Sequence, residues 1–124
     1  MIYLDTHVVV WLYSGRLDAL SLRAKASLEQ EDLLISPIVL LEMQYLKEIG
    51  RIAVPAPDIV QALTRDIGLQ VCTLSFPDVV SAALEEDWVR DPFDRLIVGQ
   101  AKAGNAGLIT RDETIRKHFP SAVW

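Results

Sequence analysis

Four carboxylates in this sequence stand at positions that a freely solvated charge does not explain. They are Asp5, Glu42, Asp94 and Asp112. Asp5 closes a short apolar run and Asp112 closely follows another, whereas Glu42 and Asp94 lie among apolar residues in helical patterns. Burial of an unpaired carboxylate is costly, so such a charge needs a proton, an arginine or a metal ion.

Glu42 is the most informative of the four acids. At about 100° per residue, the other polar residues of its predicted helix lie on the opposite side. We therefore expect Glu42 on a buried apolar face. That face comprises Ile38, Leu41, Tyr45 and Ile49. Asp94 is expected to turn inward in the same way, on a face shared with Ile97, Val98 and Ala101.

Each acid taken alone also has a structural explanation. Asp5, Asp94 and Asp112 could cap or stabilise helix N-termini, and Glu42 could form a buried salt bridge. The four together favour a shared site. Carboxylates without cysteine ligands form a hard-oxygen site that suits Mg²⁺ or Mn²⁺. Hydrolysis of a phosphodiester is the chemistry that such ions support in proteins.

Other reactive side chains in the chain predict no second site. His7 is interpreted as a core residue and His118 as a solvated helix end. Trp11 and Trp88 are expected in the core or an interface rather than as platforms for nucleobases. The single cysteine, Cys72, is expected to be a buried, inert thiol. No glycine-rich phosphate-binding loop is present.

Short apolar runs alternate with helical patterns along the chain. Strands are predicted at residues 2–5, 33–35, 69–74 and 107–110, with an edge strand at 122–124. Helices are predicted at residues 21–30, 36–49, 58–67, 75–86, 91–103 and 112–118. Residues 6–13 are apolar on all sides and predict a buried helix or a continued strand. Asp91 is interpreted as an N-cap, because proline follows it.

Alternation of this kind predicts parallel βαβ units and therefore an α/β sandwich around a mainly parallel sheet. The length of 124 residues predicts one domain, residues 1–124. Ligands of such folds bind at the carboxyl ends of the strands. Asp5 and Asp112 are expected at that edge of the sheet.

The charged residues are distributed unevenly along the chain. Seventeen acidic and twelve basic residues give a net charge of −5, which alone argues against a nucleic-acid partner. Four of the acids belong to the predicted site, however, and residues 90–124 contain six bases against four acids. The balance therefore does not exclude RNA. A single cysteine and the absence of a long apolar run predict a cytoplasmic protein without membrane contact.

Four segments in order carry a resemblance to a known family. They are Tyr3–His7 with Trp11-Leu12, Ser36-Pro37 leading to Glu42, Arg90–Ile97, and Leu108–Asp112. The sequence resembles the PIN domain family over essentially its whole length, and is close to the small bacterial VapC-type toxins. One departure is Leu41, where related chains often carry tryptophan; it bears on partner contacts rather than on catalysis.

The resemblance implies an α/β/α fold and a Mg²⁺- or Mn²⁺-dependent endoribonuclease. It also implies a homodimer and a cognate antitoxin protein as partner. By position, Asp5, Glu42, Asp94 and Asp112 form the acidic quartet. Asp5 and Asp94 are then the firmest metal ligands, Glu42 ligates metal or orients water, and Asp112 acts on a second ion or through a water.

Two alternatives stay open at the level of sequence. A PIN-like scaffold could bind a partner without catalysis. A phosphotransfer receiver domain has a similar length and an acidic pocket on a parallel sheet. Receivers need an acidic pair after the first strand and a lysine near the last, whereas Thr6 follows Asp5 here and the fourth strand ends in Thr110-Arg111-Asp112.

Overall fold

The structure is a computed structural model that describes residues 1–124. Its centre is one five-stranded sheet in which every pair of neighbouring strands is parallel, as predicted. The strands are β1 (Ile2–Leu4), β2 (Leu33–Ile35), β3 (Gln70–Val71), β4 (Gly107–Ile109) and β5 (Ala122–Val123). They lie in the order β3-β2-β1-β4-β5.

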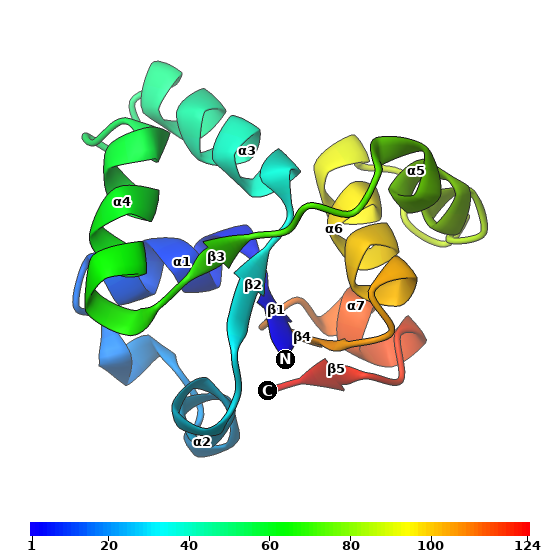
Figure 1. Cartoon of the computed structure of the whole chain (residues 1–124), viewed down its shortest axis with the longest axis horizontal. Helices are drawn as coiled ribbons and strands as arrows, with labels where there is room; N and C mark the ends of the chain where they lie inside the picture. Colours follow the sequence, from blue (N-terminus) through cyan, green and yellow to red (C-terminus); the bar gives the residue numbers. More distant parts are fainter.

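Helices cover both faces of this sheet (Figure 1). One layer contains α1 (Thr6–Tyr13), the 3₁₀ turn η1 (Leu17–Ala19), α2 (Leu22–Gln30), α3 (Pro37–Glu48) and α4 (Ala56–Ile67). The other layer contains α5 (Phe76–Leu84), α6 (Pro92–Ala103) and α7 (Glu113–His118). The predicted α/β sandwich is therefore confirmed. None of the helices combines the length and the apolar character that crossing a bilayer would require.

The strand order reverses direction at the centre of the sheet. From β1 the chain proceeds outward through β2 to β3, and it then crosses back to place β4 on the other side of β1. The helices that follow β1 and β4 consequently leave on opposite faces (Figure 1). A crevice opens at such a switch point, at the carboxyl ends of the strands, and it is the usual ligand site of open α/β sheets.

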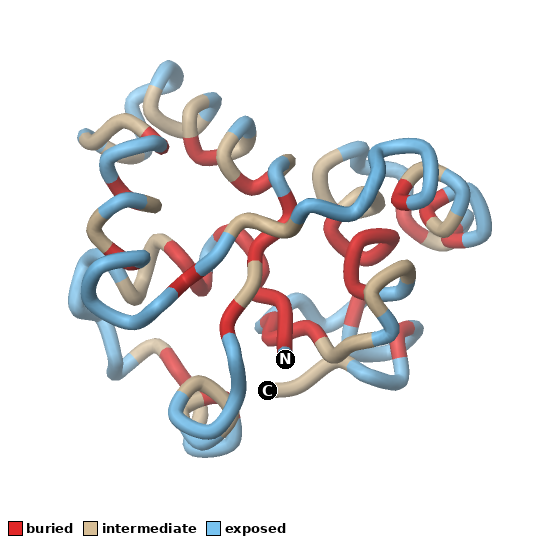
Figure 2. The backbone as a smooth tube through the Cα atoms, viewed as in Figure 1, coloured by how far each residue is buried: buried red, intermediate tan, exposed pale blue.

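The core lies on both faces of the central strands. All three residues of β1, Ile2, Tyr3 and Leu4, are buried, because helices cover the sheet on each side (Figure 2). Val8 and Val9 bring α1 into the same core. Residues 6–13 thus form the buried helix, and not the continued strand, of the two structures predicted for them.

Close packing of α5 against α6 depends on a glycine. A Cβ atom at Gly99 of α6 would lie 2.7 Å from the Cβ of Ala83 and 2.9 Å from the carbonyl oxygen of Val79. Arg95 of α6 fixes the same pair of helices, since its Nε donates to the Ala83 carbonyl at 2.8 Å and its guanidinium donates to the Leu84 carbonyl at 3.0 Å. These bonds satisfy carbonyls at the C-terminal end of α5.

Some predicted boundaries were wrong. The strand expected at residues 69–74 is only two residues long, because β3 is an edge strand and its partner β2 ends at Ile35. The helix expected at 58–67 begins at Ala56, and the helix expected at 75–86 ends at Leu84. The turn η1 was not predicted.

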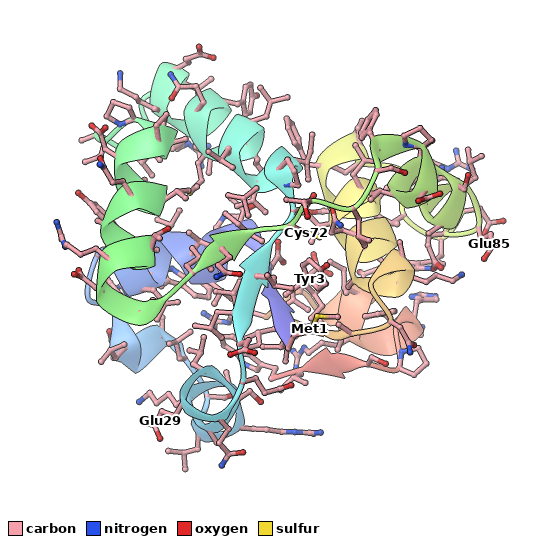
Figure 3. All side chains as sticks on the ribbon, in the orientation of Figure 1. Met1, Tyr3, Glu29, Cys72 and Glu85 are labelled. Atoms are coloured by element: carbon pink, nitrogen blue, oxygen red, sulfur yellow. The ribbon has the colours of Figure 1, made fainter.

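Cys72 is half-buried rather than fully buried, and its sulfur has polar neighbours. The Tyr3 hydroxyl donates to Cys72 Sγ at 3.0 Å, and the Gln100 amide donates to it at 3.2 Å. Figure 3 shows Tyr3 and Cys72 between the two helical layers. Burial, and secondarily the contact with Cys72, raise the pKa of Tyr3 to about 12. These bonds join β1, the end of β3 and α6.

Candidate active site

A hollow of about 450 Å³ opens at the carboxyl ends of the central strands. It is lined by Asp5, His7, Val8, Trp11, Glu42, Asp91, Asp94, Arg111 and Asp112. All four carboxylates predicted from the sequence therefore lie around one hollow, which we call the acidic hollow. They come from the end of β1, from α3, from the first turn of α6 and from the N-cap of α7.

Three of these carboxylates converge more closely than the fourth. Asp5, Glu42 and Asp94 each offer an oxygen atom, and these three atoms all lie within 4.8 Å of one another. An all-oxygen donor set of this kind suits a hard divalent cation such as Mg²⁺ or Mn²⁺. The residues present therefore fit the metal ion that the sequence predicted.

Asp5 serves both the fold and the hollow. It is the N-cap of α1, where one carboxylate oxygen accepts from the backbone N–H of Thr6 at 2.8 Å. Its other oxygen accepts from the Thr110 hydroxyl at 2.6 Å, which ties the end of β1 to the end of β4. Burial nevertheless raises the pKa of Asp5 above its ordinary value, because desolvation outweighs both bonds.

Glu42 is half-buried, and the Thr6 hydroxyl donates to its carboxylate. Burial raises its pKa, and the neighbouring charge of Asp5 adds to this increase. The face predicted to bury Glu42 was assigned wrongly, since Leu41, Tyr45 and Ile49 are exposed. The core side of α3 is instead formed by residues such as Val39 and Met43. Glu42 lies between these two apolar faces of the helix.

The carboxyl group of Asp94 is also strongly perturbed. Burial raises its pKa to about 7, with further contributions from the surrounding carboxylates. These are Asp5, Asp91, Glu42 and Asp112. Its helical neighbours Ile97, Val98 and Ala101 are buried, as predicted. Without a cation the site thus retains a proton near neutral pH, and binding of a cation releases it.

Asp112 differs from the other three acids. It is exposed, and one of its oxygens caps α7 by accepting from the backbone N–H of Ile115 at 2.9 Å. Its structural explanation as an N-cap is therefore correct, although it also lines the acidic hollow. Asp91 is likewise the predicted N-cap, of α6, and its carboxylate accepts from the Asp94 N–H at 3.0 Å.

Sequence reasoning overlooked the hydroxyl groups that hold these acids. Thr6 donates to Glu42, whereas Thr110 donates to Asp5 and accepts from the Asp112 N–H at 3.1 Å. The available signal was position, since both threonines are polar residues at the carboxyl end of a strand. Both are fully buried.

One of two aromatic residues near the acids was interpreted incorrectly. His7 is exposed at the rim of the acidic hollow, and not in the core. Trp11 is half-buried and packs against the core, as predicted, and it also lines the hollow. Both lie on the same side of α1, four residues apart, and their ring centroids are 6.1 Å from each other.

Comparison with known proteins agrees with this geometry. The family model described as "PIN domain" matches residues 2–118. Ribonuclease VapC22 of Mycobacterium tuberculosis is 32% identical over 130 residues, which cover 99% of this chain and 98% of that protein.

Solved structures share the same fold. A toxin–antitoxin complex from Klebsiella pneumoniae aligns with a TM-score of 0.70 at 22% identity, over 100% of this chain and 97% of that one. VapBC2 from Rickettsia felis, bound to a DNA fragment from its promoter, aligns with a TM-score of 0.65 at 21% identity, over 94% and 92% of the two chains. The resemblance noted in the sequence is thereby confirmed: this chain belongs to the PIN domain family.

Proposed function

We propose that residues 1–124 form one PIN domain that hydrolyses RNA, as the metal-dependent toxin of a toxin–antitoxin pair in the cytoplasm. The observation that carries this proposal is the convergence of the Asp5, Glu42 and Asp94 carboxylates within 4.8 Å at the switch point of a parallel sheet. The relative named as a ribonuclease supports RNA as the substrate. The structural neighbours solved as toxin–antitoxin complexes support an antitoxin as the partner.

Mg²⁺ or Mn²⁺ is the proposed cofactor, held by Asp5, Glu42 and Asp94. When bound, such an ion activates water and offsets the charge that develops on the phosphate. Asp112 assists with the carboxylate oxygen that the α7 cap does not use. The catalytic residues proposed are therefore the same four acids that the sequence predicted.

The chain's own part in this chemistry is to fix the acids before substrate arrives. Thr110 holds Asp5 and the backbone of Asp112 in one network, and Thr6 holds Glu42. Hydrogen bonds to carboxylates limit their rotation, so less ordering remains to be done when a cation binds. Arg111, exposed at the rim, offers a positive charge to a phosphate that approaches the hollow.

An exposed apolar surface supports the proposed homodimer. The outward stripe of α3 includes Leu41, which is 58% exposed, and Phe76 of α5 is 66% exposed. A hollow of about 260 Å³ lies between them. Apolar surface of this kind on a small protein marks an interaction site. We assign it to a second copy of this chain.

Cleavage of RNA tests the function directly. Protein purified free of antitoxin is incubated with total RNA, first with Mn²⁺ and then with EDTA. We expect cleavage with Mn²⁺ only, and a loss of at least about 100-fold in Asp94→Asn, because loss of a direct ligand should exceed the loss of about 10- to 100-fold that follows removal of a group that only orients ligands. Asp87→Asn, an exposed acid outside the hollow, is the matched control. Cleavage by Asp94→Asn in EDTA at the native rate would refute the proposal, and a folded protein that never cleaves would favour a binding scaffold.

The oligomeric state tests the apolar surface. Light scattering of the purified chain is expected to give the mass of a dimer, and Leu41→Asp the mass of a monomer. Leu22→Asp is the control, because Leu22 is 85% exposed on α2, far from α3 and α5 (Figure 1). A Leu41→Asp variant that stays dimeric, or that loses only the antitoxin, would show that a second copy does not cover this surface.

A further inference from the structure

A second hollow borders the acidic hollow on the far side of Trp11. Its volume is about 350 Å³, and it lies between the C-terminal half of α1, residues 51–54 and α4. Its lining includes Trp11, Tyr13, Arg16, Arg51, Ile52 and Ile59. It shares one lining residue, Trp11, with the acidic hollow. We call it the arginine groove.

The arginine groove carries positive charge and no negative charge. Arg16 and Arg51 are the charged residues of its lining. Arg51 is exposed and makes no ion pair. Arg16 lies 3.8 Å from Asp18, but both side chains are largely exposed, and an exposed pair of this kind is weak. A cationic groove therefore adjoins an anionic one.

Trp11 is held at the boundary between the two hollows. The ring centroids of His7 and Trp124 each lie 6.1 Å from that of Trp11, and both rings are tilted against the indole. The indole is thus positioned by two aromatic neighbours, and it is only half-buried and lines both hollows. Such a ring is a suitable platform for a nucleobase, because every base has a face that stacks on an aromatic side chain.

The reaction requires a path for the RNA strand beyond the acidic hollow. The substrate of an endonuclease continues on both sides of the bond that is cut, so the strand has to leave the acidic hollow over a bordering surface. Along α1, the rise from Thr6 to Tyr13 is about 10 Å at 1.5 Å per residue. Trp11, Arg16 and Arg51 line the same hollow, so a strand that crosses Trp11 meets both arginines within a few nucleotides.

We infer that the arginine groove binds single-stranded RNA as it leaves the acidic hollow, with Trp11 stacked on a base and with Arg16 and Arg51 on backbone phosphates. The inference rests on the proposed function, and it names the path of the substrate. Phosphates complement both charged regions, through the cation in the acidic hollow and through the arginines in the groove.

Affinity and its dependence on salt test this inference. The probe is a ten-nucleotide single-stranded RNA of mixed sequence with a fluorescent label, titrated in Ca²⁺ at several salt concentrations. The plot of log K against log salt has a negative slope, and each phosphate contact with a single strand contributes about 0.7 to its magnitude. The double variant Arg16→Gln/Arg51→Gln is therefore expected to reduce the magnitude of the slope by about 1.4. Arg23→Gln, an exposed arginine on α2, is the control and should leave it unchanged.

Trp11 supplies a second readout. Trp11→Leu is expected to weaken binding by about 5- to 100-fold, whereas Trp11→Phe, which keeps an aromatic face, should recover much of this loss. Because Trp11 also packs against the core, thermal unfolding of both variants is measured in parallel.

The outcomes separate this inference from the proposed function. An unchanged slope and affinity in the arginine double variant would overturn the inference, even if the protein cleaves RNA with Mn²⁺. Loss of antitoxin binding alone in that variant would also overturn it, because the groove would then hold a protein. RNA binding that depends on Trp11 and Arg51 in a protein that never cleaves would support the inference and refute the nuclease.

Discussion

Replacing Asp94 by asparagine removes one charge from the acidic hollow and leaves a side chain of nearly the same size. In the metal-free protein, burial and the surrounding carboxylates raise the pKa of Asp94 from 3.8 to about 7. A difference of this size corresponds to roughly 4 kcal/mol at about 1.4 kcal/mol per pKa unit. Asp94 is only partly buried, so screening by solvent reduces this to about 2 kcal/mol.

The sign of the effect follows from the raised pKa. Between about pH 4 and pH 7 the folded protein holds a proton on Asp94 that the unfolded chain has released, so the free energy of unfolding falls as pH rises through this range. Above pH 7 Asp94 is ionised in both the folded and the unfolded protein, and the free-energy cost of its buried charge is constant. Asparagine removes the cost, and the variant is therefore expected to be more stable than the native protein, by the largest margin at pH 8.

Thermal unfolding in EDTA measures this margin. For a chain of this length, about 2 kcal/mol corresponds to an increase in Tm of about 5–10 °C at pH 8, and to less than half of that at pH 5. Mn²⁺ should stabilise the native protein more than the variant, because a cation binds the ionised carboxylates. Asp87→Asn should shift neither Tm. An Asp94→Asn variant that is no more stable than the native protein at pH 8 in EDTA would refute the electrostatic reasoning.

Three further changes test the elements that support the site. Thr110→Val removes the buried donor to Asp5 and the acceptor of the Asp112 N–H, so we expect the free energy of unfolding to fall by about 1–3 kcal/mol and RNA cleavage to slow. A variant with the stability and the cleavage rate of the native protein would contradict this. Gly99→Ala forces a Cβ against Ala83 and is expected to lower the free energy of unfolding by about 1–3 kcal/mol in denaturant titration; an unchanged denaturation midpoint would contradict this. Although burial alone would raise its pKa, hydrogen bonds from Lys102 and Trp88 hold the pKa of Glu86 below its ordinary value. Glu86 thus stabilises the fold above the pKa of an unfolded glutamate and loses this effect as pH falls, so Glu86→Gln should weaken the dependence of Tm on pH below about pH 4.5. If Tm fell equally at low pH in the variant and the native protein, the contact between Glu86 and Lys102 would not contribute to stability.

Local signals in the sequence predicted most of the fold. Ser36-Pro37 and Asp91-Pro92 marked the starts of α3 and α6, because capping side chains and proline act within one helical turn. The parallel sheet followed from the alternation of strands and helices. The length of β3 could not be predicted, since the length of an edge strand is limited by a partner strand that lies far away in the sequence.

The acids of the hollow could be predicted because their positions violate local expectation, whereas the groups that hold them could not. Thr6 and Thr110 are ordinary residues for the ends of strands. Their role depends on contacts with Glu42 and Asp5, which are 36 and 105 residues away along the chain. Arg51 is similarly an ordinary loop residue, and only the fold brings it into one groove with Trp11.

The apolar periodicity of α3 shows why the burial of Glu42 was misjudged. A helical pattern identifies an apolar face but not what covers it, and α3 has two such faces. One packs on the core through Val39 and Met43, whereas Tyr45 on the other is exposed and stacks on Phe93 of α6, with ring centroids 6.1 Å apart. Phe93 is next to Asp94 in sequence, and Tyr45 is three residues from Glu42. The stacked rings therefore join α3 to α6 beside the point where the two carboxylates meet. The same aromatic contact thus helps to position both the exposed apolar face and two acids of the acidic hollow.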